Sequence, residues 1–221
     1  MHFSPLEQGL WALGGLVFWV LAYILMIRRG LLDKSYGMPV VALCLNVAWE
    51  AYFSLFSHAQ TADRVGYGIY LAADLGVLWT CWRYGPEDFR SSLTRRYFRP
   101  IMVALLAGGF ILVRQFSLAF NDGSGGISAT ITTLLLSVLL VGMLLRRDSV
   151  RGQSLYIGLL VLLGDICGWV MNLIARQTVQ ADIPLSWVTT TNVLIVAANL
   201  LYLLLYIKVA RRDRVSLLHR L

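Results

Sequence analysis

The stretch Leu10–Ile27 reads LWALGGLVFWVLAYILMI and is followed at once by Arg28 and Arg29. It contains 18 residues without a single charged side chain, which is close to the about 20 that a helix needs to cross the hydrocarbon of a bilayer. A basic pair directly after such a stretch holds that end of the helix in the cytoplasm. The stretch therefore predicts a membrane-spanning helix that runs from the outside to the cytoplasm.

Six further apolar stretches follow along the 221 residues, of which 58% are hydrophobic. Such a composition exceeds what the single core of a soluble domain can bury, and the connections between the stretches are short. The sequence predicts an all-α fold, a seven-helix transmembrane bundle that forms one domain over residues 1–221. The predicted spans are Leu10–Ile27, Pro39–Phe56, Val65–Trp82, Ile101–Phe120, Ser128–Leu145, Ser154–Ala175 and Val188–Val209.

Basic residues gather in every second connection and in the C-terminal tail, whereas the intervening ends carry only Arg64 and Arg176. Because loops rich in Lys and Arg stay in the cytoplasm, we expect the N-terminus outside and the C-terminus in the cytoplasm of a multi-pass cell-membrane protein. The formal net charge of +7 then reflects topology, and no nucleic-acid partner is expected. The basic clusters are Arg28, Arg29 and Lys34; Arg83, Arg90, Arg95, Arg96 and Arg99; Arg146, Arg147 and Arg151; and Lys208, Arg211, Arg212, Arg214 and Arg220.

Four ionisable residues lie inside the predicted spans, namely Glu50, Asp74, Arg114 and Asp165. An Asp or Arg at the centre of a membrane helix costs about 2.5–3.5 kcal/mol on insertion scales, so each is expected to face protein or water. At about 1.5 Å per residue, Glu50 and Arg114 lie roughly 7–10 Å below the outer surface, and the two aspartates lie deeper. Pairing of Arg114 with Glu50 or Asp74 is a structural alternative to a functional role.

Polar and aromatic side chains share helix faces with these acids. In the second span Asn46, Trp49, Glu50 and Phe53 follow the i, i+3, i+4, i+7 spacing of one face. Asparagines on such faces also join helices by hydrogen bonds, which is the structural alternative for Asn46, Asn172, Asn192 and Asn199. The pattern predicts a pocket in the outer half of the bundle, lined by acids and aromatic rings.

Several membrane-protein and enzyme classes lack their required residues here. The only lysines, Lys34 and Lys208, lie at or beyond span ends, so no lysine is placed to hold retinal. No zinc motif, P-loop or nucleophile elbow is present, and no paired-aspartate motif could hold Mg²⁺ against a diphosphate. We therefore expect no metal and no cofactor.

The segment Asn46-Val47-Ala48-Trp49-Glu50, then Asp74, and then Trp82-Arg83-Tyr84-Gly85-Pro86 resembles the small seven-helix terpene cyclases of fungal meroterpenoid and indole-diterpene pathways. Bacterial relatives of that family act on prenylated indole alkaloids. The resemblance implies cyclisation of a prenyl chain, started by protonating an epoxide or a terminal alkene, with Glu50 as the acid. A second acid in the last helix of the fungal enzymes falls near Asn199, so Asp74 or Asp165 could supply the proton instead.

The hypothesis from the sequence is a membrane terpene cyclase acting on a farnesyl or geranylgeranyl chain of a prenylated indole or meroterpenoid. Its partners would be that hydrophobic substrate and membrane lipid. Alternatives are a small proton- or cation-coupled transporter, a membrane sensor, or a purely structural membrane protein. The candidate catalytic residues are Glu50, Asp165 and Asp74, and the candidates for binding substrate or stabilising a cation are Asn46, Trp49, Phe53, Tyr70, Arg114, Trp169, Asn192, Asn199 and Tyr202.

Overall fold

The computed structural model describes residues 3–57, 59–89, 91–177 and 183–220. These residues form seven α-helices and one short 3-10 helix and contain no strand. The all-helical prediction is therefore confirmed for the described part of the chain. The elements are α1 (Pro5–Asp33), α2 (Val40–Leu55), α3 (Thr61–Tyr84), η1 (Gly85–Asp88), α4 (Ser92–Ala119), α5 (Gly126–Arg147), α6 (Leu155–Arg176) and α7 (Leu185–Arg212).

Local sequence signals set where three of the helices begin. Ser4 caps α1 in a capping box with Glu7, and Pro5 occupies the first turn, where its missing N–H costs nothing. Ser91 and Ser154 cap α4 and α6 in the same way, each accepting a hydrogen bond from a first-turn backbone N–H. Serine residues in the polar segments before these three helices therefore set where the helices begin.

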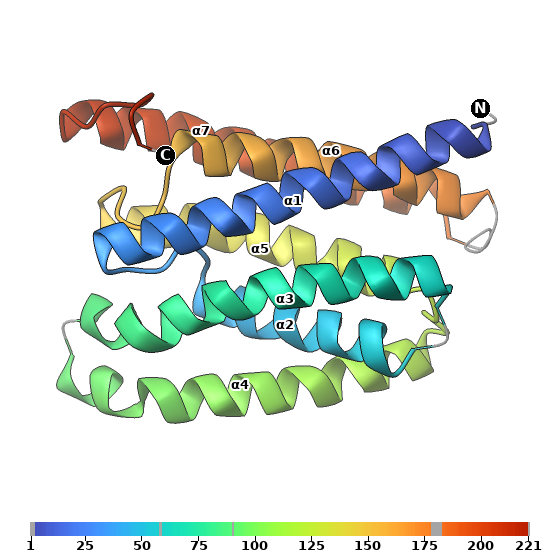
Figure 1. Cartoon of the computed structure of the whole chain (residues 1–221), viewed down its shortest axis with the longest axis horizontal. Coiled ribbons are helices and arrows are strands. Elements are labelled where there is room, and N and C mark those ends of the chain that lie inside the picture. The colour runs from blue at the N-terminus through green and yellow to red at the C-terminus, as the bar shows by residue number, and fades with distance from the viewer. Residues whose placement is uncertain (1–2, 58, 90, 178–182, 221) are drawn as a thin grey trace.

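The helices run along one long axis, with the N-terminus at one end of the molecule and the C-terminus at the other (Figure 1). α1 packs against α6 and α3, α2 packs against α3 and α4, and α5 packs against α7. The connections after α1, α3 and α5 lie at the end that holds the C-terminus (Figure 1). That end also holds the described residues of the basic clusters, whereas Arg90 lies outside the described residues. We call it the basic end; the other is the N-terminal end.

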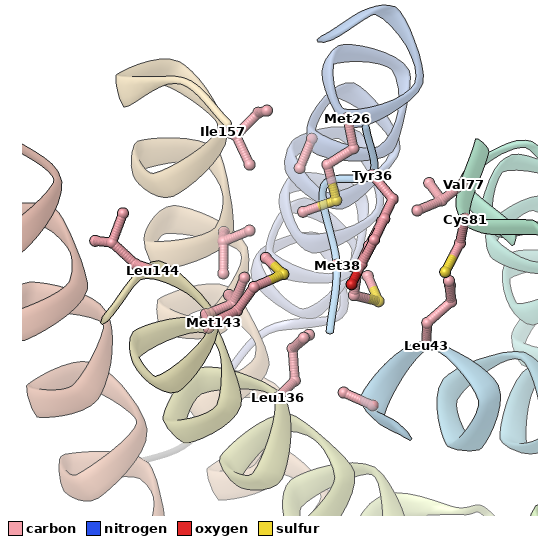
Figure 2. Packing of buried hydrophobic residues seen from close by; sticks show 14 of the residues in the cluster. Met26, Tyr36, Met38, Leu43, Val77, Cys81, Leu136, Met143, Leu144 and Ile157 are labelled. Carbon is pink, nitrogen blue, oxygen red and sulfur yellow. The ribbon is translucent and has the colours of Figure 1, made fainter. Parts of the chain in front are cut away.

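A hydrophobic core fills the basic end. Tyr36 and Met38, from the connection between α1 and α2, enter it and are buried. The guanidinium of Arg147 lies 4.1 Å from the centre of the Tyr36 ring and donates to the Tyr36 carbonyl. Figure 2 shows the cluster, which includes Met26, Tyr36, Met38, Leu43, Val77, Cys81, Leu136, Met143, Leu144 and Ile157.

Within the described residues, five helices are long and apolar enough to cross a membrane, namely α1, α4, α5, α6 and α7. α2 is apolar but has only 16 residues, which gives about 24 Å at 1.5 Å per residue. α3 has 24 residues and carries Asp63, Arg64, Asp74 and Arg83 within it. All seven predicted spans correspond to helices, whereas the count of seven crossings and the orientation stay predictions.

Candidate functional site

A cavity of about 510 Å³ lies among six helices toward the N-terminal end. On α1 its lining runs from Trp11 to Tyr23, twelve residues or about 18 Å along the helix axis. Exposed lining residues, including Leu13 and Asp63, lie near the starts of α1 and α3. The cavity therefore opens near the N-terminal end, and the acids Glu50 and Asp165 lie farther inside.

Glu50 of α2 is the centre of a buried polar cluster. Nδ2 of Asn46 lies 3.0 Å from Oε1 of Glu50, 2.9 Å from Oδ2 of Asp74 and 2.8 Å from the Tyr23 hydroxyl, and shares its two N–H donors among them. The Tyr23 hydroxyl in turn donates to Oε1 of Glu50 over 3.2 Å. Oε2 of Glu50 has no hydrogen-bond partner among the described residues. One oxygen of the carboxyl is thus held by two donors and the other is unpaired.

Asp165 of α6 contributes a second buried acid to the cavity. Its Oδ2 accepts a hydrogen bond of 2.6 Å from Nδ2 of Asn199 in α7. α6 packs against α1 and α7, whereas α2 packs against α3, α4 and α5. Glu50 and Asp165 therefore enter one cavity from separate walls, each oriented by an asparagine.

Aromatic rings form much of the wall beside Glu50. The Trp49 ring lies 4.8 Å from both the Phe53 and the Tyr67 ring, centre to centre. The Trp49 indole donates to the Ser128 hydroxyl over 2.8 Å, and that hydroxyl donates to Asp122 over 2.6 Å. Since Asp122 also accepts from the first backbone N–H groups of α5, the start of α5 fixes the orientation of the ring.

The cavity brings together six of the residues selected from the sequence. Two more lie one layer behind it, because Asp74 and Asn199 contact lining side chains without lining the cavity themselves. Such residues can position the lining groups but do not reach a ligand. The six that line the cavity are Asn46, Trp49, Glu50, Tyr70, Asp165 and Asn192.

The other four selected residues lie elsewhere. Phe53 packs behind Trp49, and Tyr202 is buried in the core of the basic end. Trp169 does not line the cavity. Arg114 is exposed on α4 and forms no ion pair with any described acid. Its expected inward position was wrong, because Val113 and Ser117 occupy the buried face of α4 and a residue one position along is rotated by about 100°.

Several lining residues were missed, above all on α1. Trp11, Gly15, Trp19 and Tyr23 line the cavity at a strict spacing of four residues, which is the spacing of one helix face. The four-residue spacing is visible in the sequence. Because every residue of the span is apolar, however, the hydrophobic pattern does not indicate which face of the helix lines a cavity. Asn172, for which the sequence suggests a hydrogen bond between helices, also lines the cavity, and the other lining residues that were not selected as site residues include Tyr67, Thr130, Thr132, Thr133 and Met171.

The chemistry available to the cavity is therefore acid–base chemistry on an apolar ligand. Asp63 lines it near its opening and Glu50 and Asp165 line it farther inside, its wall is mainly apolar and aromatic, and asparagines orient the two inner acids. Among the described residues, no group of three or more His, Cys, Asp or Glu side chains could hold a metal ion.

Comparison with known proteins places this geometry in context. The family described as Pyr4-like transmembrane terpene cyclases matches residues 2–212. The Pyr4-family terpene cyclase mfmH of Annulohypoxylon moriforme is 30% identical over 70% of this chain and 64% of its own length. The terpene cyclase atmB of Aspergillus flavus is 30% identical over 66% of this chain and 62% of its own length. The terpene cyclase ptmB of Penicillium ochrochloron is 31% identical over 72% of this chain and 66% of its own length. The chain thus spans less than two thirds of these relatives, and no solved structure matches it.

Proposed function

We propose, because the chain belongs to the Pyr4-like transmembrane terpene cyclases, that it is a membrane enzyme that cyclises a prenyl chain by protonating it. The substrate class that we propose is a farnesyl or geranylgeranyl chain attached to an indole or another aromatic head group. Family membership and five apolar helices long enough to span a bilayer make it an integral membrane protein.

The observation that carries the proposal is the arrangement around Glu50. Both polar side chains that reach this carboxyl bind Oε1, and Oε2 has no partner among the described residues. A neutral Glu50 would accept both hydrogen bonds at Oε1 and carry its proton on Oε2. Oε2 is buried and receives no hydrogen bond from a described donor, and Glu50 lines the cavity. The proposed step is transfer of the proton on Oε2 to an alkene or epoxide in that cavity, as general acid catalysis requires.

The reaction would then conserve mass. Transfer of the Glu50 proton to the terminal alkene or epoxide creates a carbocation, and inner double bonds of the chain attack it to close rings. Faces of the Trp49 and Tyr70 rings would stabilise positive charge through their quadrupoles, and the mainly apolar wall of the cavity would limit attack by water. Loss of a proton to Asp165 ends the sequence, so one proton enters, one leaves, and the product is an isomer of the substrate.

We further propose that all seven helices cross the membrane, with the N-terminus outside. Sixteen of the 19 basic residues belong to the clusters assigned to the connections after α1, α3 and α5 and to the C-terminal tail. The positive-inside rule assigns these connections to the cytoplasm. The cavity then opens toward the outer side of the membrane.

Membranes that contain the protein, supplied in separate assays with prenylated indoles, prenylated quinones, their epoxides and a prenyl diphosphate, test the proposed activity. We expect at least one substrate to give a cyclic product of unchanged mass, detected by liquid chromatography with mass spectrometry. Membranes from cells carrying the empty vector provide the control. Conversion of none of the substrates, or conversion only with loss of diphosphate from a prenyl diphosphate, would contradict the proposal.

A further inference from the structure

Two glycines inside helices line the cavity with no atom of the chain opposite them. A Cβ built on Gly66 of α3 or on Gly168 of α6 has no atom of the described residues within 4 Å outside its own stretch of helix, and both residues belong to the cavity wall. Glycine in a helix interior is less stable than alanine because it loses more backbone freedom on folding. Packing against the chain therefore does not explain why glycine occupies these two positions.

Neighbouring glycines of the same cavity have an ordinary explanation. A Cβ on Gly164 would lie 2.6 Å from the Trp19 ring, and one on Gly15 would contact Cys167 at 3.6 Å. These two glycines let helices approach closely, as small residues do between membrane helices. The space beside Gly66 and Gly168 is instead open cavity.

Both positions lie between the mouth of the cavity and its acids. α6 runs toward the N-terminal end (Figure 1), so Gly168 lies one turn nearer the mouth than Asp165. α3 runs away from that end, so Gly66 lies one turn nearer the mouth than Tyr70. α3 and α6 pack on α1, and both glycines face the same volume. A chain that reaches the acids has to pass this level.

We propose that Gly66 and Gly168 are specificity-determining residues that keep the cavity wide enough for a long prenyl chain inserted tail first. This inference rests on the proposed function and deepens it, since it assigns the end of the chain to the acids and the head group to the mouth. A larger side chain at either position takes up part of the cavity of about 510 Å³. A longer chain needs more of that volume than a shorter one, so the variant cavity discriminates against longer chains.

The test compares Gly168→Leu and Gly66→Leu on substrates that share one head group and carry geranyl, farnesyl or geranylgeranyl chains. One methylene more or less in a hydrophobic pocket changes kcat/KM by about 10–200-fold. We therefore expect each variant to lower the ratio of kcat/KM for a longer chain to kcat/KM for a shorter chain by at least about tenfold. Gly142→Leu is the matched control, because Gly142 also has nothing within 4 Å but lies on α5 outside the cavity wall. Its ratio should equal that of the wild type.

An unchanged ratio in both cavity variants, or an equal loss for all chain lengths, would overturn the inference. So would a Gly168→Leu variant that fails to accumulate in the membrane while Gly142→Leu accumulates normally, because packing would then require the glycine.

Binding of farnesol and geranylgeraniol, followed as a shift in Tm of the purified protein, gives the same comparison without turnover. A wild type that converts no substrate but binds both alcohols would refute the proposed function alone. Loss of geranylgeraniol binding in the two cavity variants, with farnesol binding retained, would still support the inference, and equal binding by all variants would refute it.

Discussion

Replacing Glu50 by glutamine isolates the proton that the proposed mechanism needs. The amide side chain of the Glu50→Gln variant can keep an oxygen where Oε1 accepts from Tyr23 and Asn46, so the polar cluster survives. The amide nitrogen takes the place of Oε2, a buried atom without a hydrogen-bond partner among the described residues, and an amide donor left unsatisfied there would cost about 1–3 kcal/mol. Loss of a general acid lowers the rate by about 10²–10⁴-fold, or about 2.7–5.4 kcal/mol of activation free energy.

Rate and stability are therefore measured on the same preparation. Single-turnover formation of the cyclic product in detergent gives the chemical step, and Tm of the same sample reports folding. We expect a loss of at least about 100-fold in rate with folded protein still present at the assay temperature.

Asp74→Asn is the matched control, since Asp74 shares the Asn46 donor with Glu50 but does not line the cavity. Asparagine retains an acceptor for that donor, and we expect a loss of less than about tenfold, below the range for a general acid. An active Glu50→Gln variant beside an inactive Asp74→Asn or Asp165→Asn variant would move the acid to that aspartate. Wild-type rates in all three would show that the buried carboxyls are structural.

Three further outcomes are expected. Cyclisation should proceed in EDTA without added Mg²⁺, because the sequence has no paired-aspartate motif for a metal-bound diphosphate; activity that is lost in EDTA and restored by Mg²⁺ would contradict this. A reporter fused after Arg96 should be cytoplasmic and one after Ser124 exterior, and a cytoplasmic reporter at Ser124 would refute the seven-span topology. Gly125→Ala should destabilise the fold by roughly 1–3 kcal/mol, because Gly125 has φ +80° and its Cβ would lie 2.7 Å from Trp49. A Cβ on Gly123 has no atom of the described residues within 4 Å, so Gly123→Ala should leave the Tm unchanged. Equal stability of the Gly125→Ala and Gly123→Ala variants would refute the argument that Trp49 packs too closely on Gly125 for a side chain.

The order and position of the helices could be predicted from hydropathy, because every crossing needs a long apolar run. The bounds of α2 and α6 agree with the prediction to within one residue at each end, whereas those of other helices differ by more. α4 begins at Ser92, nine residues before the predicted start at Ile101, and continues through Pro100. Hydropathy marks the part of a helix that lies in lipid, whereas a polar first turn capped by Ser91 can extend into water.

The site was predictable where a polar residue was out of place in an apolar run, as for Glu50 and Asp165. The site was not predictable where it depended on which face of a helix is buried and which is exposed. Arg114 belongs to the exposed face of α4, although it lies only one residue from buried Val113. Tyr23 binds Glu50 directly, yet an aromatic residue in an all-apolar helix gives no sign of its partner. Only tertiary packing decides which face of such a helix meets the cavity.

Because Glu50 and Asp165 line a single cavity, the proposed reaction leaves the proton at a different depth from the one where it started. Glu50 lies five residues before Leu55, the last residue of α2, or about 7.5 Å along the axis, whereas Asp165 lies eleven residues before Arg176, the last residue of α6, or about 16.5 Å. With all seven helices across the membrane, the proton returned from Asp165 to Glu50 would cross only part of the transmembrane electric field. Moving one charge through the whole field is worth about 2.3 kcal/mol per 100 mV, and turnover in sealed vesicles should therefore depend only weakly on an imposed diffusion potential.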